Sequence, residues 1–292
     1  MRPGEASTRR TIRRRYTKDF AYSEELLTAA HKLHGLLCDK DVPPAQKCSK
    51  VVAVGLWMKL CKQYRSILVL CELGLVKDAE VVARSLFESA VQTLFVLKRN
   101  IRLRRGWRNA PKPPRRGFSA EFRAKLYLAR NALNLRKQVN VWQSKRGLRR
   151  ATRPAVKPVA GMVKTAQSWL GPAWINWLES DKCKAAFTVE MMAVNVGLGR
   201  WYDGVYRPQS AVAHANDALD NLDLGKRPMT IDAHLRPDIE RATVPLRLAN
   251  VMCVHAAHAV NARFGLGFDA TLDELAAGAQ TVEAKMAAPF SC

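Results

Sequence analysis

Apolar residues recur at steps of three and four along most of the chain, which is the spacing of one face of an α-helix. The clearest run is SKVVAVGLWMKLCKQYRSILVLCELG, where the residues that share a face are Ala53, Trp57, Leu60, Tyr64, Ile67, Leu68 and Cys71. Ser49 suits the N-cap of this helix, and Gly74 suits the left-handed residue just past its end. No segment shows the sustained two-residue alternation of a half-buried strand, so the pattern predicts an all-α helical bundle.

A second apolar run begins after a short turn. The segment AEVVARSLFESAVQTLFVLKRN, which Asp78 can cap, is apolar on nearly every side, so we expect a central and buried helix. Only a few residues join it to the preceding helix. A connection that short predicts an antiparallel helical hairpin.

Further helices are predicted on both sides of this hairpin. Their expected ranges are 22–38, 119–142, a stretch from 159 that carries Trp169, Trp174 and Trp177, then 182–199, 200–222 and 238–264. Pro43 and Pro44 end the first helix, and Ser119 can cap the second. One face of the second helix carries Phe122, Leu126, Ala129, Leu133 and Arg136. We expect the three tryptophans to be core anchors, and the basic ranges 101–118 and 144–158, with their prolines and glycines, to be loops.

The chain of 292 residues, 48% of them hydrophobic, can bury a substantial core. The pattern divides it into a basic disordered tail (1–20), the first half of a helical body (21–100), a basic and partly helical insertion (101–157), the second half of the body (158–265) and a weakly ordered tail (266–292). No apolar run approaches the ~18 residues that a membrane span needs, so no membrane partner is expected.

The compartment is argued from the first residues and from the cysteines. TRRTIRRRY looks like a twin-arginine export signal, but the charged TKDFAYSEELL follows where an apolar region should be. The seven cysteines are scattered and form no CxxC pair. Cys61 and Cys71 lie within helical patterns, as reduced thiols in a core do, so we expect a cytoplasmic protein.

Positive charge is concentrated in two segments. The formal net charge is +23, and residues 98–157 contain twenty arginines and lysines against Glu121 alone. Clustered positive charge is typical of proteins that bind a polyanion such as nucleic acid. The arginines expected to contact it are Arg104, Arg105, Arg115, Arg116, Arg123, Arg130, Arg149 and Arg150. Solubility and an arginine-rich genome are the alternative explanation of the same charge.

Candidate chemistry gathers in the stretch YRPQSAVAHAND. Pro208 suits the first turn of a helix and disfavours an α conformation at Arg207, which therefore stands at the helix entrance. Ser210 and His214 are four residues apart on one face, and Asp217 follows one turn later. One edge of this helix thus presents a cation, a hydroxyl, an imidazole and a carboxylate.

A second polar pair interrupts the buried helix. Arg84 and Glu88 are four residues apart among apolar neighbours, and buried charges are costly unless they are paired and hydrogen-bonded. Ser210 or His214 could supply a third polar group if the two helices are neighbours. The set is either a functional site or an ion pair that fixes helix register.

These two segments together resemble a known family. GLVKDAEVVARSLFESAVQTLFVL followed by YRPQSAVAHA looks like a widespread bacterial family of helical proteins known only as a domain of unknown function. Its hallmarks are an Arg-Ser-Leu-x-Glu-like motif after a Gly-Leu-x-x-x-Ala turn, and a later Tyr/Ser/His segment. The resemblance covers roughly residues 50–100 and 195–225 and leaves the basic insertion and both tails outside.

The later segment is also similar to the R-x(4–6)-H signature of HEPN-type helical ribonucleases, through Arg207, six intervening residues and His214. This resemblance implies cleavage of RNA, rather than DNA, without a metal ion, at a composite site that two copies of the chain form. It assigns general acid or base catalysis to His214, charge stabilisation in the transition state to Arg207, and orientation of the imidazole or phosphate to Ser210.

Other readings fit the sequence less closely. His31, His34 and Cys38, or His255 and His258, are weak metal candidates because their spacing departs from that of paired zinc ligands. No cofactor motif is present, so no metal or cofactor is expected. A non-catalytic interaction module that binds nucleic acid or an acidic protein is the main alternative function. Binding of the basic helix 119–142 to a membrane surface comes third, because its apolar face is narrow.

Overall fold

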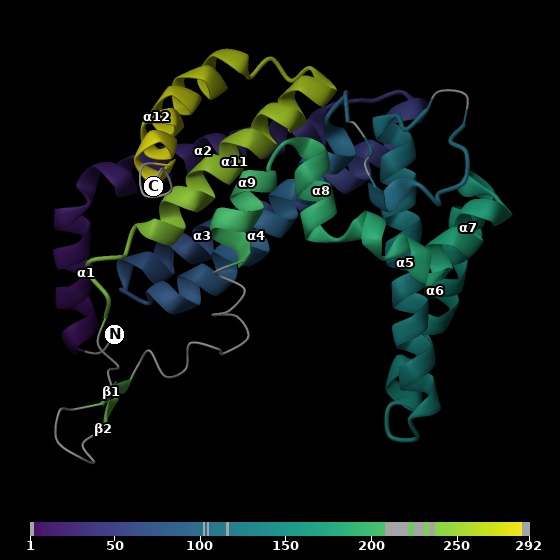
Figure 1. Cartoon of the computed structure of the whole chain (residues 1–292), viewed down its shortest axis with the longest axis horizontal. Helices are drawn as coiled ribbons and strands as arrows, with labels where there is room; N and C mark the ends of the chain where they lie inside the picture. The colour runs from purple at the N-terminus through teal and green to yellow at the C-terminus, as the bar shows by residue number, and fades with distance from the viewer. Residues whose placement is uncertain are drawn as a thin grey trace.

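The computed structural model describes residues 3–101, 103, 105–114, 117–207, 222–224, 231–233 and 237–287. These residues are almost all helical, which confirms the all-α prediction (Figure 1). The α-helices are α1 (Pro3–Arg15), α2 (Thr17–Asp39), α3 (Lys47–Glu72), α4 (Val76–Leu97), α5 (Ala120–Ser144), α6 (Arg149–Leu170), α7 (Pro172–Glu179), α8 (Val189–Val196), α9 (Gly199–Trp201), α11 (Val244–Phe264) and α12 (Asp269–Ala287). Short 3-10 turns occupy Pro44–Gln46 (η1), Arg105–Trp107 (η2), Asp181–Cys183 (η3) and Ala185–Phe187 (η4), and η5 (Tyr202–Tyr206) is a π-helical turn. The strands β1 (Leu222–Leu224) and β2 (Ile231–Ala233) form one antiparallel pair, with Asp223 opposite Asp232.

The centre of the molecule is the α3–α4 hairpin that the sequence predicts. Helix α11 packs along both of its helices, and α2 packs on α3 (Figure 1). Trp57 and Tyr64 of α3 are fully buried. The Trp57 indole donates to the Ala30 carbonyl at 3.1 Å, and the Tyr64 hydroxyl donates to Asn250 of α11. These two bonds tie α2 and α11 to the hairpin and satisfy polar groups that burial would otherwise leave without partners.

The turn between α3 and α4 depends on Gly74. Its φ is +71°, the left-handed conformation that the sequence predicts there, and α4 begins at Val76 rather than after Asp78. A Cβ at this position would lie 2.6 Å from the Cβ of Pro237. The Asp238 amide donates to the Gly74 carbonyl at 3.0 Å. A distant part of the chain therefore closes on this turn, and only glycine leaves room for it.

Another helix caps the start of α3. The helix begins at Lys47, before the predicted cap Ser49, whose hydroxyl donates back to Gln46. The Glu121 carboxylate of α5 accepts from the Cys48 and Ser49 amides at 3.1 and 2.9 Å. A carboxylate at a helix N-terminus accepts hydrogen bonds from the free amides, and its negative charge is stabilised by the positive end of the helix dipole. The local sequence of α3 cannot reveal a cap that comes from α5.

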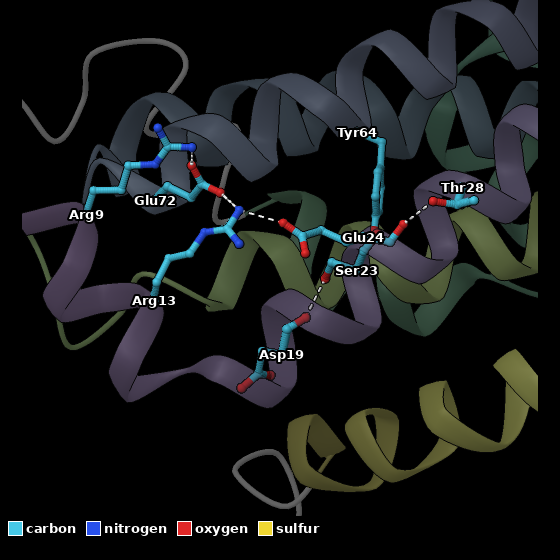
Figure 2. A network of polar contacts seen from close by, with 8 residues as sticks. All are labelled: Arg9, Arg13, Asp19, Ser23, Glu24, Thr28, Tyr64 and Glu72. Atoms are coloured by element: carbon cyan, nitrogen blue, oxygen red, sulfur yellow. Dashed lines mark hydrogen bonds and ion pairs between the residues drawn. The ribbon is translucent and has the colours of Figure 1, made fainter. Parts of the chain in front are cut away.

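The sequence predicts a disordered tail over 1–20, but the described part of this range, residues 3–20, forms α1 and the start of α2 instead. Ile12 is fully buried, and Arg9 and Arg13 form ion pairs with Glu72 at the end of α3 (Figure 2). The Glu72 side chain is only 2% exposed. A carboxylate buried to that extent needs cations, and the basic composition of α1 supplies them.

The C-terminal range also differs from its prediction as a weakly ordered tail. Residues 269–287 form α12, whose Leu272 and Leu275 are buried, and the Tyr22 hydroxyl donates to the Leu275 carbonyl at 2.7 Å. The preceding helix, α11, begins at Val244 rather than near residue 238. Its Pro245 occupies the first turn, where the missing amide costs nothing.

The basic middle of the chain is a second helical hairpin, α5–α6. The Ser119 hydroxyl caps α5 by accepting from the Phe122 amide at 3.2 Å, as predicted. The predicted apolar face of α5 is also confirmed, because these side chains are buried: Phe122, Leu126, Ala129 and Leu133. Figure 1 shows that the hairpin extends well away from the other helices, with the α5–α6 connection at its far end.

The loop predicted over 144–158 is wrong, because α6 already begins at Arg149. The Gln143 amide closes the short connection by donating to the Arg149 carbonyl and to the Thr152 hydroxyl, at 3.1 and 2.6 Å. Pro154 and Pro158 lie inside α6, and both are exposed. Water can therefore bond the carbonyl oxygens that a proline leaves unpaired.

An aromatic cluster joins the base of this hairpin to the body. Trp174 and Trp177 of α7 are buried, as predicted, with ring centroids 5.5 Å apart. Trp169, predicted with them, is 37% exposed instead. Trp107 from the range 101–118 lies 5.4 Å from Trp177, so this otherwise irregular connection is anchored in the core. Among the described helices none is long and apolar enough to cross a membrane.

Candidate functional site

Tyr206 brings the later motif onto α4. The π-helical turn η5 places its ring 5.5 Å from Phe87 and 5.0 Å from the guanidinium carbon of Arg84, and the residue is only 7% exposed. Its hydroxyl donates to Glu88 Oε1 at 2.7 Å and accepts from Arg84 Nη2 at 3.2 Å. Arg84 and Glu88 also face each other, with Nε to Oε1 at 3.8 Å. The two motifs therefore meet, and Tyr206 is the third polar group.

The protonation of this network follows from its burial. Loss of solvent around the phenol, and then its hydrogen bond to the carboxylate, raise the pKa of Tyr206 to about 12. The phenol is therefore a protonated donor at neutral pH. The sequence predicts a buried pair here, but the Arg84 and Glu88 side chains remain 21% and 29% exposed. Arg84 Nε is itself buried and has no hydrogen-bond acceptor among the described residues.

Arg207 lies on the outer side of Tyr206. Its Nε is 3.2 Å from Asp203, its Nη2 is 3.5 Å from Glu190, and its guanidinium carbon is 5.3 Å from the Tyr202 ring centroid. Tyr202 stacks on Tyr206 with centroids 5.0 Å apart. Two stacked rings thus separate the Arg207 and Arg84 guanidinium groups. Arg207 has α-helical backbone angles although Pro208 follows it, which differs from the prediction.

Ser210 and His214, the other two members of the predicted catalytic set, lie outside the described residues, as does Asp217, which was predicted to support them together with Arg84 and Glu88. The structure thus shows how the segment begins and where Arg207 stands. Tyr206 is a site residue to which the sequence assigns no role. Its place at the start of YRPQSAVAHAND marks it as part of the motif, but nothing in its spacing indicates that it contacts α4.

The arginines predicted to bind nucleic acid separate into three groups. Arg104, Arg115 and Arg116 lie outside the described residues. Arg105 is the first residue of η2, but its side chain is not among the described ones. Arg123 and Arg130 lie at the base of the α5–α6 hairpin. Arg149 and Arg150 lie at its far end.

Arg123 is a structural residue, which corrects its assignment to nucleic-acid binding. It is 1% exposed and donates to the carbonyls of Phe95 and Val96 at 2.7 and 3.3 Å, and also to those of Lys98 and Phe118. Loss of solvent lowers the pKa of its guanidinium to about 10. It satisfies the free carbonyls at the end of α4 and joins them to the start of α5.

Arg130 also points inward rather than to a partner. Its guanidinium carbon lies 4.6 Å from the centroid of Phe187, and burial lowers the pKa of the group. A cation on an aromatic face at this distance contributes about 0.5–2 kcal/mol of packing. The base of the hairpin is therefore held together by two of the arginines that the sequence suggested for RNA.

Arg149 and Arg150 are exposed, as a binding role requires. They line a hollow at the far end of the hairpin together with Gln143, Arg146, Arg153, Pro154, Val156 and Lys157. Arg146, Arg153 and Lys157 are not among the residues predicted to bind nucleic acid. The helical spacing of 149 with 153, and of 150 with 157, is the signal that would have grouped them.

The described residues contain no group of three or more histidine, cysteine, aspartate or glutamate side chains that could hold a metal ion. His34 Nε2 and Cys38 Sγ, two of the weak metal candidates, lie 3.6 Å apart on α2. A site of two ligands is too small for the tetrahedral coordination that zinc prefers.

The chain belongs to a family of unknown function (DUF5677), whose model matches residues 50–227. The matched range begins in α3, contains both motifs and also encloses residues 101–157, which the sequence analysis placed outside it. No curated protein and no solved structure matches the chain.

Proposed function

We propose that the chain binds RNA and that the segment from Arg207 to His214 cleaves the bound strand without a metal ion. The observation that carries this proposal is the docking of Tyr206 between Arg84 and Glu88. It fixes the start of the segment on the central helix of the fold. A reactive group gains from such positioning, because small displacements reduce catalysis strongly.

The proposed reaction uses the 2′-hydroxyl of RNA. As the 2′-oxygen attacks the adjacent phosphorus, the 2′-hydroxyl loses a proton and the leaving 5′-oxygen gains one. His214 makes one of these two transfers, as general base or general acid, and solvent water makes the other. The phosphorus–5′-oxygen bond breaks, which leaves a 2′,3′-cyclic phosphate and a 5′-hydroxyl end. Arg207 stabilises the charge on the phosphoryl oxygens, and Ser210 orients the imidazole or the phosphate.

Arg207 has to exchange partners to play this part. Its guanidinium already faces Asp203 and Glu190, but its side chain is 58% exposed, and exposed ion pairs hold their partners by about 1 kcal/mol or less. A phosphate can therefore displace these carboxylates. The stacking of Tyr202 on Tyr206 keeps the arginine close to α4 during the exchange.

The test is an RNA cleavage assay with purified protein in EDTA. We expect cleavage in the chelator, no cleavage of a strand with 2′-deoxyribose at every position, and a loss of about 10²- to 10⁴-fold in His214→Ala, the typical contribution of a general acid or base. His31→Ala, an exposed histidine of α2, is the matched control and should cleave normally. Activity that EDTA abolishes, or that survives in His214→Ala, would contradict the proposal.

A non-catalytic interaction module is the second candidate function. The observation that favours it is that Arg84 and Glu88 both bond the Tyr206 hydroxyl, and that two carboxylates already balance Arg207. In this case Tyr206→Phe lowers the melting temperature and there is no cleavage to lose. The partner is then nucleic acid or an acidic protein. Analytical ultracentrifugation would show whether two copies of the chain associate, as a composite site requires.

A further inference from the structure

We propose that the far end of the α5–α6 hairpin is the binding surface for single-stranded RNA. We call this surface the hairpin tip. It consists of the exposed Trp142 and of the residues of the hollow whose side chains can bond a phosphate, which are Gln143, Arg146, Arg149, Arg150, Arg153 and Lys157. The choice of RNA rests on the proposed function. The placement of the binding surface rests on the geometry and charge of the tip alone.

The backbone of the hairpin tip is held in place by two packed helices. These helices carry the tip away from the body, which leaves it open to a long partner (Figure 1). Val139 and Val159, buried between the helices, hold them together below the tip. The bonds of Gln143 to the Arg149 carbonyl and the Thr152 hydroxyl fix the connection. The cations therefore stand in a fixed arrangement rather than on a flexible loop.

The charge of the tip is uncompensated. The hollow contains five cationic side chains and no carboxylate, and none of them takes part in an ion pair among the described residues. Other arginines of the chain behave differently: Arg136, lower on the same hairpin, pairs with Glu179, and Arg13 pairs with Glu72. Five like charges around one concavity repel one another, and a chain of phosphates relieves that repulsion.

Exposed apolar groups beside these cations favour single-stranded over double-stranded nucleic acid. Trp142 is 40% exposed in the last turn of α5, and Leu148 in the connection is 43% exposed. An exposed indole offers a face on which an unpaired base can stack, and such stacking is worth about 1–3 kcal/mol per base. The bases of a duplex already stack on one another, so the indole adds little to duplex binding. A lipid surface also attracts cations and tryptophan, but these cations line a hollow, which fits a strand better than a plane.

Binding is measured separately from cleavage. The probe is a fluorescent 20-nucleotide RNA of mixed sequence with 2′-O-methyl riboses, which 2′-oxygen attack cannot cut, and fluorescence anisotropy reports its affinity for the full chain. The test variant is Arg149→Gln, Arg150→Gln and Arg153→Gln combined. The matched control, Arg10→Gln, Arg14→Gln and Lys18→Gln, removes the same charge from exposed positions of α1 and α2. Circular dichroism confirms that both variants keep the wild-type helix content.

We expect the test variant to bind at least about tenfold more weakly and to reduce the salt slope by about two, because each phosphate contact to a single strand contributes about 0.7. The control should stay within about twofold of wild type, since its charges lie outside the proposed surface. Trp142→Ala should weaken binding of the single strand by about tenfold or more and leave the affinity for a duplex of the same sequence unchanged.

Three results would overturn the proposal. The first is wild-type affinity in the test variant, and the second is an equal loss in test and control variants. The third is binding to phosphatidylserine vesicles that the test variant loses while it still binds RNA, which would make the tip a membrane contact. Failure of the proposed cleavage is a distinct result: His214→Ala then has no activity to lose, while binding of the uncleavable strand at the tip remains.

Discussion

The Tyr206 phenol donates a 2.7 Å hydrogen bond to Glu88 and so joins the end of a π-helical turn to the middle of α4. The acceptor is a half-exposed carboxylate, and hydrogen bonds to charged groups contribute about 1.5–3 kcal/mol when they are sheltered. Tyr206→Phe removes this bond and keeps the ring on Phe87. We expect a loss of about 1–2 kcal/mol in the free energy of unfolding, measured by urea denaturation. If Glu88→Gln costs nothing further in the Tyr206→Phe background, the two residues act as one unit.

The same phenol predicts a pH dependence. Its pKa is about 12 in the folded protein and 10.0 for a tyrosine in an unfolded chain, so the unfolded chain releases the proton first. The stability that Tyr206 contributes is then complete below pH 10 and is lost as the pH rises through 12. Burial also raises the pKa of Tyr22, Tyr64 and Tyr127, so the measurement is the difference between wild type and Tyr206→Phe. Thermal denaturation should show that this difference shrinks between pH 10 and pH 12; a constant difference would contradict the assignment.

Arg123 should matter for stability and not for binding. Arg123→Met leaves the carbonyls of Phe95 and Val96 buried without a donor, which should cost about 3 kcal/mol or more in the free energy of unfolding. The control is Arg150→Met on the exposed side of α6, which should change stability by about 0.5 kcal/mol or less. Equal effects of the two substitutions would mean that the buried arginine is dispensable.

The contact of α1 with Glu72 predicts a rescue. Arg9→Ala combined with Arg13→Ala leaves a 2% exposed carboxylate without its cations, which should cost about 2 kcal/mol or more. Glu72→Gln in that background should restore part of the stability, because the buried charge is then gone. Arg10→Ala with Arg14→Ala removes two exposed cations of the same helix and should be nearly neutral. Chemical denaturation of these three variants and of the wild type gives the comparison.

Substitutions at Gly74 and Gly265 can separate two effects on stability, the strain of a positive φ and a steric clash with a neighbouring residue. Gly74→Ala meets both a positive φ and the Pro237 side chain at 2.6 Å, whereas Gly265→Ala meets a positive φ of +58° in open space. A left-handed alanine costs about 1–2 kcal/mol, so Gly265→Ala should lose about that much. Gly74→Ala should lose clearly more, as read from urea midpoints. Similar losses would show that residues 237–238 can move aside.

Much of the central fold could be predicted from the sequence, because its signals are local. The period of α3, the short turn at Gly74 and the apolar surface of α4 were sufficient for the hairpin. Ser119 identified the start of α5 for the same reason. The predictions were wrong where contacts between residues far apart in the sequence, or across a tight connection, determine whether a segment is helical. Glu72 gives α1 its partner, and Gln143 closes the connection that turns a supposed loop into the start of α6.

The candidate site was predicted in part. The pairing of Arg84 with Glu88 follows from their spacing, and a third polar group beside them, supplied by Tyr206, follows from the cost of burying charge. The hydrogen bonds of Tyr206 to Arg84 and Glu88 could not be predicted from the sequence, because the π-helical turn sets the direction of its side chain. Composition alone also could not distinguish arginines that hold the hairpin, such as Arg123, from those that face solvent, such as Arg150.

Helix α11 lies beyond residue 227, where the family match ends, yet it packs along α3 and α4, and its Asn250 accepts the buried hydroxyl of Tyr64. The stretch that sequence comparison delimits is therefore shorter than the unit that can fold. A fragment trimmed to residues 50–227 would expose the apolar side of the central hairpin to water and should aggregate. Any shortened version for crystallisation or screening should keep α2 and α11 at its two ends.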